Sequence, residues 1–212
     1  MAIAHEGMTG KYGLGIGRVI RENYSHDMLT RMRSLTAAAS EARMGGCDMP
    51  VVINSGSGNQ GIACSVPLIV YAREMELPDY SLYRALVFSN LLYCVSEILY
   101  WQTIGILWCG VCILCGRSSH HLYGRGKYFP DQKDYRKYSG EHSGNHLRWS
   151  KISCAAKIAA SLDAAFLAHH LAMNGQSYAP YTGILQEETA ENHQLCGADR
   201  KRWNERNRPR NP

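Results

Sequence analysis

The helix-forming pattern of this chain is clearest over residues 27–46, which read DMLTRMRSLTAAASEARMGG. Asp27 is a residue type that favours the N-cap of a helix, and Gly45-Gly46 is where we expect the helix to end. Apolar side chains recur between these ends at helical spacing; they are Leu29, Met32, Leu35, Ala38 and Ala39. This spacing predicts a helix over 27–44.

Three other segments, 62–75, 79–90 and 153–174, show the same periodicity. The last combines closely spaced alanines with large apolar residues, and we expect it to end at Gly175. No segment outside 91–150 shows the alternation of polar and apolar residues that is typical of a strand. The predicted fold class is therefore all-α.

Length and composition are those of an ordinary globular domain. The 212 residues are 45% hydrophobic and 19% charged, which excludes a collagen, a long coiled coil and a disordered polyelectrolyte. The N-terminus lacks a secretory signal pattern. The eight cysteines are too irregularly spaced for a small disulfide framework, so we expect free or metal-bound thiols and a cytoplasmic location.

The chain has two distinct compositions. The net charge of +5 divides into +4 over 117–150, +2 over 188–212 and −1 over the rest. All four tryptophans and five of the eight cysteines lie within 91–150 and 188–212. These two segments therefore depart from the pattern of their neighbours.

Residues 54–61, which read NSGSGNQG, lie between an apolar run and the helix predicted from 62. Glycines allow a ligand to approach closely, and free backbone N–H groups at a helix N-terminus favour a carboxylate or phosphate. The candidate binding residues are Asn54, Ser55, Gly56, Ser57, Gly58, Asn59 and Gln60. The loop matches neither the Walker sequence nor the dinucleotide fingerprint, and a flexible loop without a ligand is the alternative.

Other features of the departing segments suggest different functions. Cys109, Cys112 and Cys115 have the spacing of the first three cysteines of a bacterial ferredoxin, but the fourth does not follow. Residues 98–116 carry no charge and are long enough to span a membrane. The basic tail from 200 to 210 has the composition of a nucleic-acid or membrane contact. We expect neither partner, because nothing around these segments supports such a site.

Three blocks of the sequence together resemble the L-cysteine desulfidase family, which is related to the alpha chain of iron–sulfur L-serine dehydratases. The blocks are YGLGIG at 12–17, the long block from Leu35 to Gly61, and KISCAAKIAA at 151–160. With 62–90 and 155–187 the resemblance covers about two-thirds of the chain. It corresponds to the C-terminal part of a longer family protein, so we expect one truncated domain over 1–212.

The resemblance implies an all-α fold with a [4Fe–4S] cluster held by three cysteines, whose open iron acts as a Lewis acid on the leaving group. L-cysteine would be converted to sulfide, ammonia and pyruvate. The residues of the 54–60 loop would line the pocket for this small amino-acid substrate. An L-serine dehydratase and a non-catalytic carboxylate-binding remnant are the alternatives, and a homo-oligomer is compatible with each.

The cluster cysteines are where the chain departs from the family pattern. Cys154 matches the family's Ser-Cys-Ala-Ala segment, whereas Cys109 is a poorly matched counterpart of another ligand and no Cys-Asp-Gly segment is present. Reading 91–146 and 188–212 one nucleotide later permits family-like sequences. We therefore interpret 91–150 and 188–212 as translated outside the ancestral frame, and expect this chain to have little or no activity.

Overall fold

The computed structural model describes residues 1–54, 56–99, 153–174 and 176. The described chain forms helices and no strand, which confirms the predicted all-α class. The helices are α1 (Ala2–Thr9), α2 (Ile16–Asn23), α3 (Met28–Met44), α4 (Gly58–Glu74), α5 (Asp79–Leu99) and α9 (Ser153–Met173).

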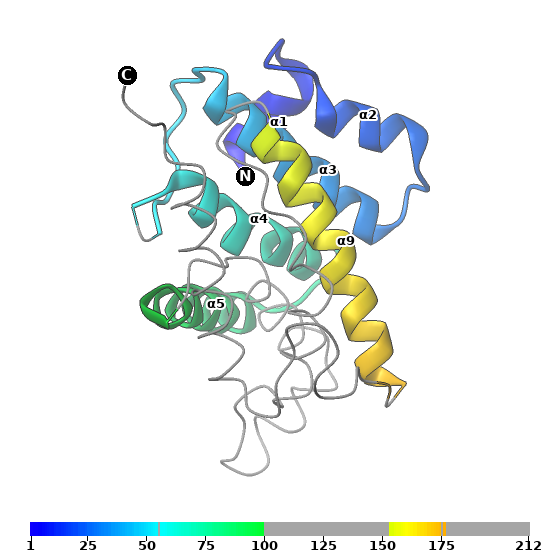
Figure 1. The fold of residues 1–212 in the computed structure, drawn as a ribbon, viewed down its shortest axis with the longest axis vertical. Helices are drawn as coiled ribbons and strands as arrows, with labels where there is room; N and C mark the ends of the chain where they lie inside the picture. The colour runs from blue at the N-terminus through cyan, green and yellow to red at the C-terminus, as the bar shows by residue number, and fades with distance from the viewer. Residues whose placement is uncertain (55, 100–152, 175, 177–212) are drawn as a thin grey trace, which may run out of the picture.

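Helix α3 is the centre of the fold, and α1, α2, α4 and α9 all pack against it (Figure 1). Asp27 caps its first turn, because its carboxylate accepts a hydrogen bond of 2.7 Å from the Thr30 amide. Its alanines are fully buried and let neighbouring helices approach closely. At the crossing with α1, a Cβ on Gly7 would lie 2.1 Å from the Ala38 carbonyl oxygen, so only glycine fits there.

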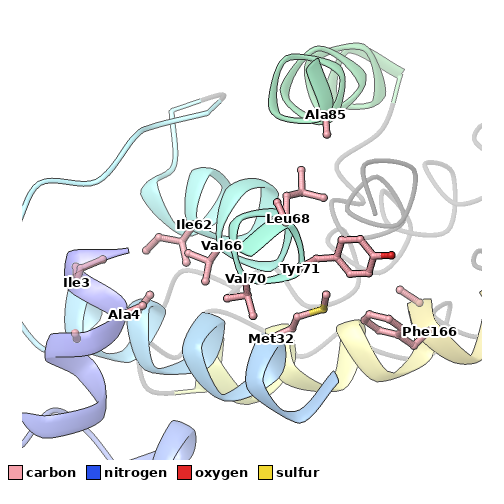
Figure 2. Close-up of a cluster of buried hydrophobic side chains, with 14 residues drawn as sticks. Ile3, Ala4, Met32, Ile62, Val66, Leu68, Val70, Tyr71, Ala85 and Phe166 are labelled. Atoms are coloured by element: carbon pink, nitrogen blue, oxygen red, sulfur yellow. The ribbon is translucent and has the colours of Figure 1, made fainter. Parts of the chain in front are cut away.

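The main hydrophobic core lies along α4, between α3 and α5 (Figure 2). Met32 of α3 is fully buried on one side of α4, and on the other side Ala85 of α5 faces Leu68. Tyr71 of α4 and Phe166 of α9 face one another at the end of this core. A second cluster joins α2, α3 and α9 through Ile20, Ala37, Ala155 and Ala159.

Four of the six described helices were predicted from the sequence pattern, two of them with nearly the observed bounds. The helix predicted over 27–44 is observed at Met28–Met44, and that predicted over 153–174 at Ser153–Met173. Helix α4 begins four residues earlier than predicted, inside the glycine-rich loop, and α5 continues nine residues beyond 90. The short helices α1 and α2 were not predicted.

Several sequence-based expectations fall on residues outside the described part of the chain. They concern Cys109, Gly175, the cysteine run, the polar segment 117–150 and the basic tail. Most of the uncharged run at 98–116 lies there too. Among the helices that the structure describes, none is long and apolar enough to cross a membrane.

Candidate functional site

The predicted binding loop is a tight turn that leads directly into α4. The backbone N–H of Ser57 donates to the Asn54 carbonyl oxygen at 2.9 Å, and the Asn54 N–H donates back to Ser57 at 3.2 Å. Gly56 has φ +78°, a left-handed conformation that favours glycine at the third position of such a turn. Ser55 lies outside the described residues. The glycine of this turn is thus required by backbone geometry.

The first turn of α4 presents backbone donors that have no acceptor among the described residues. Ser57 is the N-cap, but its side chain makes no capping hydrogen bond. Within the described residues, no acceptor pairs with the amides of Gly58, Asn59 or Gln60, whereas the Gly61 amide donates to the Ser57 carbonyl. Three N–H groups at a helix N-terminus carry a partial positive charge and suit a small anion.

Arg43, from the last turn of α3, lies beside this helix start. One of its terminal nitrogens donates to Asn59 Oδ1 at 3.4 Å. A Cβ on Gly58 would lie 2.3 Å from Arg43 Nε, so the absence of a side chain at Gly58 makes room for the guanidinium. The sequence did not single out Arg43, because its proximity to α4 depends on how the two helices pack.

Two further contacts hold the loop in place. A Cβ on Gly61 would lie 1.8 Å from the carbonyl oxygen of Val52, so the chain before the turn passes directly over the first turn of α4. Asn54 is 5% exposed, and its amide nitrogen donates at 2.8 Å to Asn90 Oδ1 on α5. The buried Oε1 of Gln60 has no described hydrogen-bond partner. The loop is therefore fixed to α5 and to its own flank.

The described cysteines do not form a cluster site. Cys154 is the second residue of α9, Cys47 follows α3, and Cys64 is fully buried within α4. Among the described residues, no group of three or more Cys, His, Asp or Glu side chains could hold a metal ion. The described part of the chain does not fit a [4Fe–4S] cluster by itself. Cys109 lies outside it.

Cys47 instead contacts Tyr12. The Tyr12 hydroxyl donates to Glu6 Oε1 at 3.1 Å. Its hydrogen bonds with Cys47 and Glu6 raise the pKa of Tyr12 to about 12. Tyr12 is therefore a protonated hydrogen-bond donor at neutral pH, and it ties the segment after α3 to α1.

The structure also contains an anion site that the sequence pattern did not reveal. The backbone amides of Leu14, Gly15 and Ile16, at the start of α2, donate to the carboxylate of Glu41 on α3. Glu41 is 3% exposed, and Gly13 and Gly15 both have positive φ, which the turn requires. The glycine spacing at 13–17 was the available signal. A side chain of the protein already fills this amide pocket.

Comparison with known proteins identifies the family of this chain. The profile of the family described as "serine dehydratase alpha chain" matches residues 1–107, half of the chain. The chain belongs to the serine dehydratase alpha chain family. The match includes α1 to α5, the amide pocket of Glu41 and the whole 54–61 loop. The sequence resemblance is thereby confirmed at the level of this family.

Several curated relatives are named UPF0597 proteins. One from Desulfitobacterium hafniense is 42% identical over 190 residues, which cover 87% of this chain and 43% of the relative. Others come from Lachnoclostridium phytofermentans (35% identical, 87% of this chain and 44% of the relative) and Treponema denticola (37%, 89% and 45%). The chain spans less than half the length of these family members. No solved structure is significantly similar to it.

Proposed function

We propose that this chain is an amino-acid lyase of the L-cysteine desulfidase type, whose 54–60 loop binds the carboxylate of the substrate. One observation carries the proposal. The amides of Gly58, Asn59 and Gln60 have no described acceptor, and the Arg43 guanidinium lies beside them.

This arrangement suits a carboxylate for electrostatic reasons. The aligned peptide dipoles of the 17-residue helix α4 place a partial positive charge at its first turn. Arg43 adds a full charge, and charge-assisted hydrogen bonds are about twice as strong as neutral ones. The absence of a side chain at Gly58 lets the Arg43 guanidinium approach the helix start closely.

In the proposed reaction, L-cysteine and water give hydrogen sulfide, ammonia and pyruvate. The role of the described residues is to bind and orient the amino acid through its carboxylate. The family's iron–sulfur cluster is part of the proposal as a cofactor, but the described cysteines do not form a site for it. An L-serine dehydratase would use the same carboxylate site, and the resemblance of the loop to the desulfidases favours cysteine.

A second candidate is a carboxylate-binding protein without lyase activity. The observation that favours it is the scattering of Cys47, Cys64 and Cys154 over three parts of the described fold. Both candidates predict binding of a small amino acid at the start of α4. They differ in whether the bound amino acid loses its β-substituent.

Isothermal titration of L-cysteine and L-serine into the purified chain under anaerobic conditions tests the binding site. Arg43→Gln should weaken binding by about ten-fold or more, because a guanidinium–carboxylate interaction is lost. The matched control is Arg31→Gln, since Arg31 is 55% exposed and pairs with Glu74. Equal affinity of Arg43→Gln and the unaltered chain would refute the site.

Turnover is measured separately, after anaerobic reconstitution with iron and sulfide. Release of sulfide and pyruvate in equal amounts from L-cysteine supports the lyase. Pyruvate from L-serine at a higher rate supports the dehydratase. Binding without turnover of either amino acid supports the carboxylate-binding protein.

A further inference from the structure

Helix α5 is apolar on two opposite faces. One face packs against α4 through Leu82, Ala85 and Leu86. The other carries four large apolar side chains that are each about 60% exposed: Tyr80 at 60%, Tyr83 at 61%, Val87 at 59% and Leu91 at 62%. Their spacing of three, four and four residues places them in one stripe along the helix.

Such a stripe is unusual at a protein surface. A large exposed apolar patch marks an interaction site. Among the described helices, α4 is the main neighbour of α5, which lies at the edge of the described fold (Figure 1). No described helix packs extensively against the outward face.

A residue of α5 next in sequence to the end of the stripe contacts the candidate binding loop. Asn90, which precedes Leu91, accepts a hydrogen bond from Asn54 at 2.8 Å. Immediately before Asn54, Val52 and Ile53 are 71% and 64% exposed. We call these side chains together the α5 surface; its members are Tyr80, Tyr83, Val87, Val52 and Ile53. A hollow of about 410 Å³, lined by Met1, Arg73 and Tyr83 among others, lies at its other end.

The matched relatives are longer than the part that corresponds to this chain. The matched stretch makes up only 43–45% of the relatives from Desulfitobacterium hafniense, Lachnoclostridium phytofermentans and Treponema denticola. More than half of each relative therefore lies outside the part that corresponds to this chain. Among the described residues, the α5 surface is an extended apolar face against which such a remaining part could bury apolar side chains.

We propose that the α5 surface is the docking site for this remaining segment of the family's proteins. The segment would bury the apolar stripe and insert a side chain into the hollow beside Tyr83. Because Val52 and Ile53 flank the loop, the docked segment would also close one side of the 54–60 site. The docking proposal does not depend on which substrate the 54–60 loop binds.

The test uses the part of the Desulfitobacterium hafniense relative that lies outside the 190-residue match, fused to a soluble carrier protein. Its binding to the full present chain is measured by calorimetry. Tyr83→Lys and Val87→Lys should each weaken binding by about ten-fold or more, because a charge then enters an apolar contact. Both positions are exposed, so far-UV circular dichroism should show unchanged helix content.

Val19→Lys is the matched control, since Val19 is 51% exposed on α2 and lies outside the α5 surface. It should leave binding unchanged, and Arg43→Gln should impair amino-acid binding without affecting the segment. The 190-residue part of the relative that matches this chain is also tested as a binding partner for the segment. Absence of binding to both, or equal weakening by Val19→Lys, would overturn the proposal. Dimers of the present chain that Val87→Lys dissociates would assign the surface to a second copy instead.

Discussion

Glu41 occupies the amide pocket of a glycine-rich turn with a side chain of the protein itself. Its carboxylate is almost fully buried and accepts hydrogen bonds from three consecutive amides at the start of α2. Those amides would otherwise be unpaired helix-terminal donors. A buried carboxylate is tolerated when its hydrogen bonds are satisfied. Glu41 therefore connects α2 to α3 and explains why the turn before α2 contains glycines.

Replacing Glu41 with Gln should destabilise the fold by about 2–4 kcal/mol. The carboxamide places an NH₂ group against backbone N–H donors, and hydrogen bonds to a charged group contribute about 1.5–3 kcal/mol each. Urea unfolding of the two proteins measures the difference. Glu74→Gln is the control, because Glu74 pairs with the exposed Arg31 and its loss should cost less than about 1 kcal/mol. Equal stability of the two variants would contradict this account.

At the scale of the helix, the first turn of α3 is capped by a titratable side chain, that of Asp27. The hydrogen bond from the Thr30 amide, with one from Ser25, lowers the pKa of Asp27 below its ordinary value of 3.8. A lowered pKa means that the ionised cap stabilises the folded state above pH 3.8. This contribution is lost as the pH falls through the lower folded-state pKa.

Asp27→Ala should therefore lower the free energy of unfolding by about 1 kcal/mol at pH 7. The difference between Asp27→Ala and the unaltered protein should shrink as the pH is brought below 3.8. Asp27→Asn should keep most of the cap without this pH dependence, because asparagine caps about as well as aspartate. Thermal unfolding at pH 3 and pH 7 compares the three proteins. A difference that stays constant with pH would refute the role of the charge.

The start of α4 offers a comparison between two glycines of the same loop. Gly61→Ala should cost about 3 kcal/mol or more, since its Cβ would collide with the Val52 carbonyl and separate the loop from the helix. Gly56→Ala should cost about 1–2 kcal/mol, because space around Gly56 is open and only its positive φ is strained. Unfolding by urea ranks the two variants. The reverse order would show that the loop is held differently.

Across the whole molecule, α9 is joined to the N-terminal helices by an ion pair as well as by apolar contacts. Arg33 of α3 is 8% exposed and lies 2.7 Å from Asp163 of α9, and it also contacts the ring of Tyr24. Burial raises the pKa of Asp163, while Arg33 acts in the opposite direction. The pair therefore serves mainly to compensate the buried guanidinium, which cannot lose its charge.

Removing the two partners should consequently have unequal effects. Asp163→Asn leaves a buried, uncompensated cation and should cost about 2–3 kcal/mol. Arg33→Met keeps the packing of the stem and leaves Asp163, which is 42% exposed and can be hydrated, so it should cost about 1 kcal/mol. Urea unfolding at pH 7 gives both values. A greater loss of stability in Arg33→Met than in Asp163→Asn would show that the ring contact with Tyr24 contributes more than the ion pair.

The sequence by itself determined the class of the fold, the position of its longer helices and the family. Apolar spacing and the Asp27 cap are local properties, so they placed α3 and α9 within a residue or two. The short helices α1 and α2 were missed because eight residues give too little periodicity to recognise. The glycines of the 54–61 loop could also be recognised as those of a helix start.

Only the tertiary structure decided which of the two glycine-rich turns has its amides filled by a side chain of the protein. Glu41 fills the turn before α2 from 25 to 27 positions away in the chain, whereas the first turn of α4 keeps three amides without a described acceptor and has Arg43 beside it. Likewise, the outward apolar stripe of α5 can be recognised only when the opposite face of this helix is known to pack on α4. The physical reason is that these contacts join residues distant in sequence, and helical periodicity carries no information about which faces meet.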